Sequence, residues 1–171
     1  MFMALKKDPE SAQDAALAKA KKDALRLLSF RARSIQELRG RLMRKNHPPA
    51  LVEQVLEFCL KQGLLDDEKF AKLYALSRIQ SRPVGKNLIQ RDLQSKGVSA
   101  QIVQQALGTL VDFDEKQTAL DMATRRHQRM SGLDENVSKA RLYGFLKRRG
   151  FTGEAVFYAL TQLYKGAESF E

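Results

Sequence analysis

The chain contains 171 residues, of which 43% are hydrophobic and 29% are charged, and this balance is typical of a globular protein rather than a disordered chain. Thirty Lys and Arg against 20 Asp and Glu give a net charge of +10, which favours a polyanionic partner: nucleic acid, an acidic protein surface or an anionic membrane. One cysteine, Cys59, excludes an internal disulfide framework, and no segment approaches the roughly 20 apolar residues that a membrane-spanning helix needs. The first residues lack the apolar region of a signal peptide, so we expect a soluble cytoplasmic protein.

The first part of the chain has the pattern of a helical module. Few prolines and glycines, with no sustained alternation of apolar and polar residues, predict an all-α fold. Residues 1–23 are expected to form a partly helical N-terminal extension, and residues 24–63 a first three-helix module. Within this module, Ser34 and Glu37 have the spacing of a capping box that opens a helix, and Asn46 tolerates the left-handed conformation that ends it.

Two further modules follow with the same order of signals. Residues 64–110 are predicted to form the second module, with its middle helix over 86–96. The inward face of its first helix is predicted to contain Phe70, Leu73, Tyr74 and Ser77. Residues 111–165 are predicted to form the third module, with its middle helix over 137–149, and the last six residues, 166–171, a flexible tail.

One short pattern occurs three times: an inward leucine, a cation one position before the helix end, and then a residue that stops the helix. The stop residues are Asn46, Gly97 and Gly150, which lie 51 and 53 residues apart. This internal repeat predicts three tandem three-helix modules that stack into an elongated, curved molecule. Gly40 and Gly144 also hold equivalent positions inside helices, where close helix approach and simple tolerance are equally good explanations.

The candidate binding residues are cations, densest in the second module and extended by the last copy of the repeated pattern. The predicted site for a polyanionic partner comprises Arg78, Arg82, Lys86, Arg91, Lys96, Arg148 and Arg149. A solvated face explains the second-module cluster equally well. A cation in the last helical turn contributes ~0.3–1 kcal/mol, which accounts for Lys45, Lys96 and Arg149 without any ligand. A further basic run is interpreted as a solvated helix face: Arg125, Arg126, His127 and Arg129.

The sequence carries no pattern that indicates catalysis. His47 and His127 lack Cys or carboxylate partners at metal-ligand spacing, and the acidic clusters at 66–68 and 112–115 suit helix N-termini. Neither a phosphate-binding glycine loop nor a nucleophile elbow is present. We therefore expect a protein that is not an enzyme, with no catalytic residues, no metal and no cofactor.

Several short motifs are specific for a protein family when they are taken together in their order along the chain. Each motif alone is weak, because it contains only the capping and apolar residues common to many helices. They are Ser34, Ile35, Gln36, Glu37, Leu38 and Leu42; residues 63–71; Ser77, Arg78, Gly85 and Ile89; residues 93–98; and residues 145–151. Together they resemble the RecX family, bacterial regulators of the RecA recombinase, over about residues 25–163.

The resemblance implies tandem three-helix repeats, in agreement with the internal repeat. It implies binding in the helical groove of the RecA–single-stranded DNA filament, across neighbouring subunits. It further implies inhibition of the recombinase, ATPase and coprotease activities of RecA, and thus a role in DNA repair, recombination and the SOS response. Some family members also bind DNA directly, so single- and double-stranded DNA are further expected partners of a chain that we expect to be a monomer without membrane association.

Two other functions stay open at this point. A basic DNA-binding helical repeat protein could affect recombination by competing for DNA, and its inhibition of RecA would then fall with salt as its DNA binding falls. An α-helical adaptor with an unrelated partner is the third hypothesis.

Overall fold

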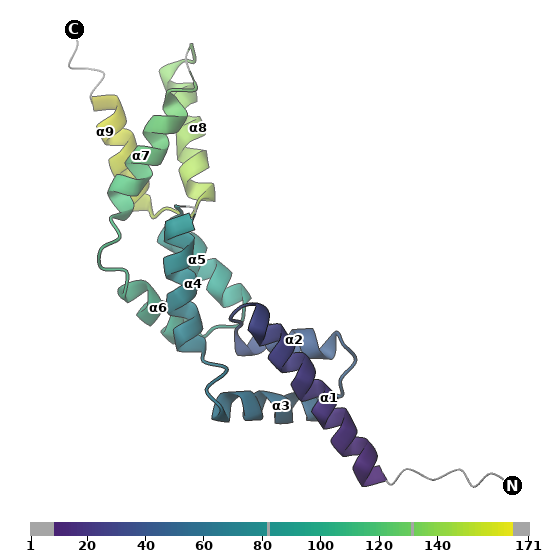
Figure 1. The fold of residues 1–171 in the computed structure, drawn as a ribbon. Coiled ribbons are helices and arrows are strands. Elements are labelled where there is room, and N and C mark those ends of the chain that lie inside the picture. The colour runs from purple at the N-terminus through teal and green to yellow at the C-terminus, as the bar shows by residue number, and fades with distance from the viewer. Residues whose placement is uncertain (1–8, 82, 131, 166–171) are drawn as a thin grey trace, which may run out of the picture. The chain divides into compact units, whose positions relative to one another are not determined.

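The computed structural model describes residues 9–81, 83–130 and 132–165, and this part of the chain contains nine α-helices and no strand (Figure 1). The all-α prediction is therefore confirmed. The tail predicted at residues 166–171 lies outside the described residues. The helices are α1 (Pro9–Phe30), α2 (Ile35–Met43), α3 (Pro49–Lys61), α4 (Asp67–Ser81), α5 (Lys86–Ser95), α6 (Ala100–Gly108), α7 (Glu115–His127), α8 (Glu135–Arg148) and α9 (Gly153–Lys165).

The first of two compact units contains α1, α2 and α3, and its described residues are 9–70 together with 96–98. Two alanines one turn apart on α1, Ala20 and Ala24, are fully buried, and such small side chains let the neighbouring helices approach closely. The rest of this core consists of Leu38, Leu42, Val52, Val55, Leu56, Cys59 and Leu65.

The second compact unit contains the described residues between 71 and 95 and between 99 and 165. In its C-terminal part α7 lies alongside α9, and α8 packs on both (Figure 1). Phe151, directly after the last glycine stop, is the largest fully buried side chain of the described residues. Around it lie Ala119, Ala123, Leu142, Leu146, Ala155, Val156, Ala159 and Tyr164.

The helix ends follow the capping signals of the sequence. Ser34 and Glu37 form both halves of the predicted capping box at the start of α2. Asn46, Gly97 and Gly150 have φ angles of 62°, 79° and 79°, so all three predicted stops adopt the left-handed conformation. The Asp134 carboxylate accepts hydrogen bonds from two main-chain amides, and α8 therefore begins at Glu135, earlier than predicted.

The predicted inward face of α4 is partly wrong. Leu73 is 52% exposed and Ser77 is also exposed, whereas Ala71 and Ala75 are fully buried beside the predicted Phe70. The buried face of α4 therefore contains Phe70 and the two alanines, and both leucines of the helix, Leu73 and Leu76, are exposed.

The glycines inside helices are explained by tolerance. A Cβ atom on Gly40 would meet nothing within 4 Å, so close helix approach is excluded there. A Cβ atom on Gly144 would meet only the flexible end of Arg148, at 3.1 Å. Neither glycine is required by packing against another helix.

Candidate functional site

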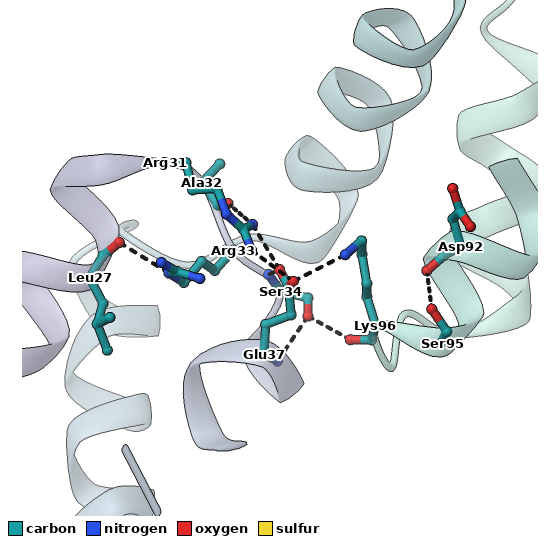
Figure 2. Close-up of polar contacts among 9 residues, drawn as sticks. All are labelled: Leu27, Arg31, Ala32, Arg33, Ser34, Glu37, Asp92, Ser95 and Lys96. Carbon is teal, nitrogen blue, oxygen red and sulfur yellow. Dashed lines mark hydrogen bonds and ion pairs between the residues drawn. The ribbon is translucent and has the colours of Figure 1, made fainter. Parts of the chain in front are cut away.

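The turn at Lys96–Val98 docks on the N-terminus of α2. Ser34 Oγ donates a hydrogen bond of 2.5 Å to the Lys96 main-chain carbonyl while it caps its own helix (Figure 2). A Cβ atom on Gly97 would overlap the Gln36 side chain, so only glycine fits this close approach. The first main-chain amide of α2, that of Ile35, donates to the Asp67 carboxylate at 2.9 Å.

The same arrangement recurs at the N-terminus of α5, inside the second unit. The amides of Gly85 and Asn87 donate to the main-chain carbonyls of Arg149 and Gly150, both at 3.0 Å. Glu115 accepts the Lys86 amide at 2.9 Å, as Asp67 accepts that of Ile35. The repeated cation–glycine pattern is therefore a docking element between helices as well as a helix stop.

Lys96, a predicted site residue, is engaged by an internal carboxylate. Its Nζ lies 3.1 Å from Glu37 Oε1, and Arg31 donates two hydrogen bonds to the same carboxylate (Figure 2). Burial alone would raise the pKa of Glu37, but the hydrogen bonds and charges of Arg31 and Lys96 lower it to about 2. The Lys96 side chain is only 23% exposed, and its ammonium group is paired within the chain.

Arg78, a second predicted site residue, is also paired. Its Nη2 lies 3.3 Å from Asp92 Oδ2, and the Tyr74 hydroxyl donates to the same oxygen at 2.9 Å. The Arg78 side chain is part-buried, and its Nε has no hydrogen-bond partner among the described residues. This arginine ties α4 to α5 and offers less charge to a partner than the sequence suggests.

The other cations of the predicted second-module cluster differ in accessibility. Arg82 lies outside the described residues. Lys86 is half-buried and Arg91 is exposed, as is Arg148 at the end of α8. Within the described part of the chain these three form no ion pair, so they keep their charge available for a partner.

Arg149, the last predicted site residue, belongs to an arginine-rich pocket inside the second unit. The pocket has a volume of about 460 Å³ and is lined by four arginines, Arg125, Arg126, Arg129 and Arg149. Its apolar wall consists of Pro83, Met122, Met130 and Phe145. The structure thus brings one predicted site residue together with a basic run that the sequence analysis interpreted as solvated surface.

Two of these arginines share one aromatic ring. The guanidinium carbon of Arg126 lies 4.5 Å from the centroid of Phe145, and that of Arg149 lies 5.5 Å from it. Such cation–π contacts hold a guanidinium in place while its N–H groups stay available. Among the described residues none of the four arginines pairs with a carboxylate, and no acidic residue lines the pocket.

The sequence carries a signal for this pocket. Arg125 and Arg129 lie four residues apart at the end of α7, with Arg129 just beyond its last residue, and Phe145 and Arg149 lie four residues apart at the end of α8. Residues with this spacing share a helix face. Two such pairs, at the ends of helices that are expected to pack together, indicate that these side chains meet.

Each histidine contacts a polar side chain of the same chain. His47 Nε2 lies 3.0 Å from Asp23 Oδ2, and this carboxylate also binds Lys45. His127 Nδ1 lies 3.1 Å from Ser138 Oγ, which is buried. The described residues include no group of three His, Cys, Asp or Glu side chains suited to a metal ion. No helix in the described ranges has the length and apolar character to span a membrane.

Comparisons with known proteins assign the chain to a family. Three consecutive family models match it: the first three-helix domain of RecX over residues 20–59, the second over 66–107 and the third over 114–160. The regulatory protein RecX of Chlorobium limicola is 37% identical over 142 residues, which cover 83% of this chain and 87% of that protein. The regulatory protein RecX of Mycolicibacterium smegmatis is 36% identical over 150 residues, covering 84% and 80%.

Solved structures agree at the level of the fold. The crystal structure of RecX from Lactobacillus salivarius superposes with a TM-score of 0.79 at 18% identity, covering 89% of this chain and 99% of that one. The three domain models match the chain one after another, as the internal repeat predicts. The relatives are matched over most of their length. The chain therefore belongs to the RecX family of regulatory proteins.

Proposed function

We propose that this chain binds in the helical groove of the RecA–single-stranded DNA filament and inhibits the recombinase, ATPase and coprotease activities of RecA. Through that inhibition it modulates DNA repair and the SOS response in the cytoplasm. The observation that carries the proposal is the match to all three RecX domains in order. The net charge of +10 supports it, because a filament that contains DNA presents phosphates.

The mechanism is occupancy of a surface and involves no chemical step. Lys86, Arg91 and Arg148 keep charges that no carboxylate of the described chain neutralises, and the arginine-rich pocket adds four more. Charge-assisted hydrogen bonds from these side chains would hold the protein on the filament as a monomer. Inhibition follows if the bound chain resists the rearrangements of filament subunits that accompany ATP hydrolysis and strand exchange.

The first test is the effect of the purified chain on RecA bound to single-stranded DNA. At stoichiometric amounts we expect the DNA-dependent ATPase rate to fall and the filament length distribution in electron micrographs to change. Unchanged rates and unchanged lengths would refute regulation by direct binding.

A matched pair of variants tests the proposed contacts. Arg91→Glu combined with Arg148→Glu reverses two exposed cations of the predicted site, whereas Arg41→Glu combined with Arg141→Glu makes the same net-charge change elsewhere. The first pair should weaken inhibition at least tenfold and the second should weaken it much less. Equal effects of the two pairs would show that only net charge matters.

A second function, competition for DNA without contact to RecA, is favoured by the unneutralised arginines of the pocket. Under that hypothesis, salt should weaken naked-DNA binding and RecA inhibition in parallel, because both would depend on counterion release. Under the leading proposal inhibition persists at salt concentrations that abolish binding to naked DNA. Measuring both quantities across one salt series separates the two functions.

A further inference from the structure

We propose that the arginine-rich pocket binds single-stranded nucleic acid directly, with the arginines on the phosphodiester groups and the apolar wall against a base and its sugar. The inference deepens the proposed function and rests on it only for the choice of nucleic acid as the polyanion. It assigns a specific ligand to a basic run whose sequence pattern indicates only a solvated helix face.

Charge is the first argument for a phosphate ligand. Four guanidinium groups converge on one pocket with no lining carboxylate, and like charges held together favour the arrival of an anion. A guanidinium presents N–H groups in a fixed fork that matches two oxygens of a phosphate. Arg125, in the last turn of α7, and Arg129, in the turn that follows this helix, are both exposed and can contact successive groups of an extended anion.

Preorganisation is the second argument. The Phe145 ring lies 4.5 Å from the Arg126 guanidinium and 5.5 Å from that of Arg149, so one aromatic side chain positions a cation of α7 and the cation that caps α8. Holding these flexible side chains before binding reduces the entropy that a ligand must overcome. Solvated cations on an ordinary helix face have no such support.

The apolar wall is the third argument, and it distinguishes a nucleotide from a simple anion. Met122, Met130 and Pro83 offer contact area that inorganic phosphate or an acidic side chain cannot use. The volume of about 460 Å³ lies within the range of small-ligand sites, which is roughly 300–1,000 Å³. Bases of a single strand are free to enter such a pocket, whereas bases of a duplex are stacked and paired.

The test uses the full chain, a fluorescent thymidine oligonucleotide and no RecA. Arg125→Ala with Arg129→Ala removes two pocket cations, and Arg41→Ala with Arg141→Ala removes two exposed cations elsewhere as the matched control. Loss of two phosphate contacts should reduce the slope of log affinity against log salt by about 1.4, since each single-strand contact contributes about 0.7. We expect at least a tenfold loss of affinity for the pocket pair and less than threefold for the control pair.

Three further measurements separate this ligand from its rivals. Arg149→Lys keeps the charge but loses the planar fork, so affinity should still fall several-fold; full retention would refute a guanidinium clamp. Oligonucleotides with abasic sites should bind more weakly if the apolar wall receives bases. Competition by polyglutamate as effective, per charge, as competition by the oligonucleotide would overturn the assignment to nucleic acid.

RecA inhibition by the same variants distinguishes the two proposals. If the pocket pair binds naked DNA normally but no longer inhibits RecA, the pocket contacts RecA, and the inference fails while the proposed function stands. If the pocket pair loses DNA binding but still inhibits, the inference stands and inhibition does not require this pocket. Circular dichroism spectra that match the parent chain are required of every variant. If the pocket pair fails this criterion, the single substitution Arg129→Ala replaces it, with an expected slope change of about 0.7.

Discussion

Gly85→Ala is the substitution whose effect the structure specifies most sharply. A Cβ atom at this position would overlap the main-chain atoms of Gly150 and Phe151, and a main chain cannot move aside as the end of a flexible side chain can. The substitution also forces apart two hydrogen bonds, those from the amides of Gly85 and Asn87 to the carbonyls of Arg149 and Gly150. The expected damage is therefore at the N-terminus of α5 and not inside a helix.

The magnitude follows from these two effects. Overpacking of a tight contact costs about 1–3 kcal/mol, and each lost main-chain hydrogen bond costs about 0.5–1.5 kcal/mol net. We expect the free energy of unfolding to fall by about 2–6 kcal/mol. Gly40→Ala is the control, because its Cβ would meet nothing within 4 Å and alanine favours the helix by about 0.5–1 kcal/mol.

Urea unfolding followed by circular dichroism measures both variants, and native-state hydrogen exchange at the Asn87 amide reports the contact itself. Gly85→Ala should unfold at lower urea and lose protection at Asn87, while Gly40→Ala should unfold at the same or higher urea. An unfolding midpoint of Gly85→Ala equal to that of the parent chain would refute the docking role of this turn.

Three further predictions concern the first unit. Ser34→Ala should lower the free energy of unfolding by about 1–2 kcal/mol, more than Ser99→Ala in the same urea experiment, because Ser34 caps α2 and also donates to Lys96. The pKa of Glu37 is about 2 in the folded chain and 4.5 as its ordinary value, so its stabilisation is present above pH 4.5 and is lost as the pH falls towards 2. Glu37→Gln should therefore flatten the decline of stability over that interval, and an unchanged decline would contradict the assignment. Cys59 is fully buried and burial raises its pKa, so a thiol reagent should modify it only in urea and not in the native chain.

The helical elements could be predicted because their signals are local. The capping box at Ser34 and the left-handed stops at Asn46, Gly97 and Gly150 depend on residues within one or two turns, and all are confirmed. The face of α4 could not be predicted as reliably, since either a leucine stripe or an alanine stripe can be buried. In the structure Ala71 and Ala75 are buried, whereas Leu73 and Leu76 are exposed.

The candidate site depended on contacts that local patterns do not contain. Lys96 was predicted to bind a partner, but its carboxylate partner, Glu37, lies 59 residues earlier in the chain. Arg126 was interpreted as a solvated cation, but it shares the Phe145 ring with Arg149 from another helix. Charge density along the sequence identified basic regions, whereas the structure decides which charges are neutralised and which converge.

The docked turns also explain why one of the three stop residues differs from the others. Gly97 and Gly150 cannot carry a side chain, because a Cβ atom would overlap Gln36 or Leu88. Asn46 is exposed, so it needs only the left-handed backbone and not an empty side-chain position. During divergence of a duplicated repeat, selection on a docked turn admits one amino acid, whereas an exposed turn can drift. In an engineered array, a copy of the first module moved to an internal position would therefore need Asn46→Gly before its turn could pack.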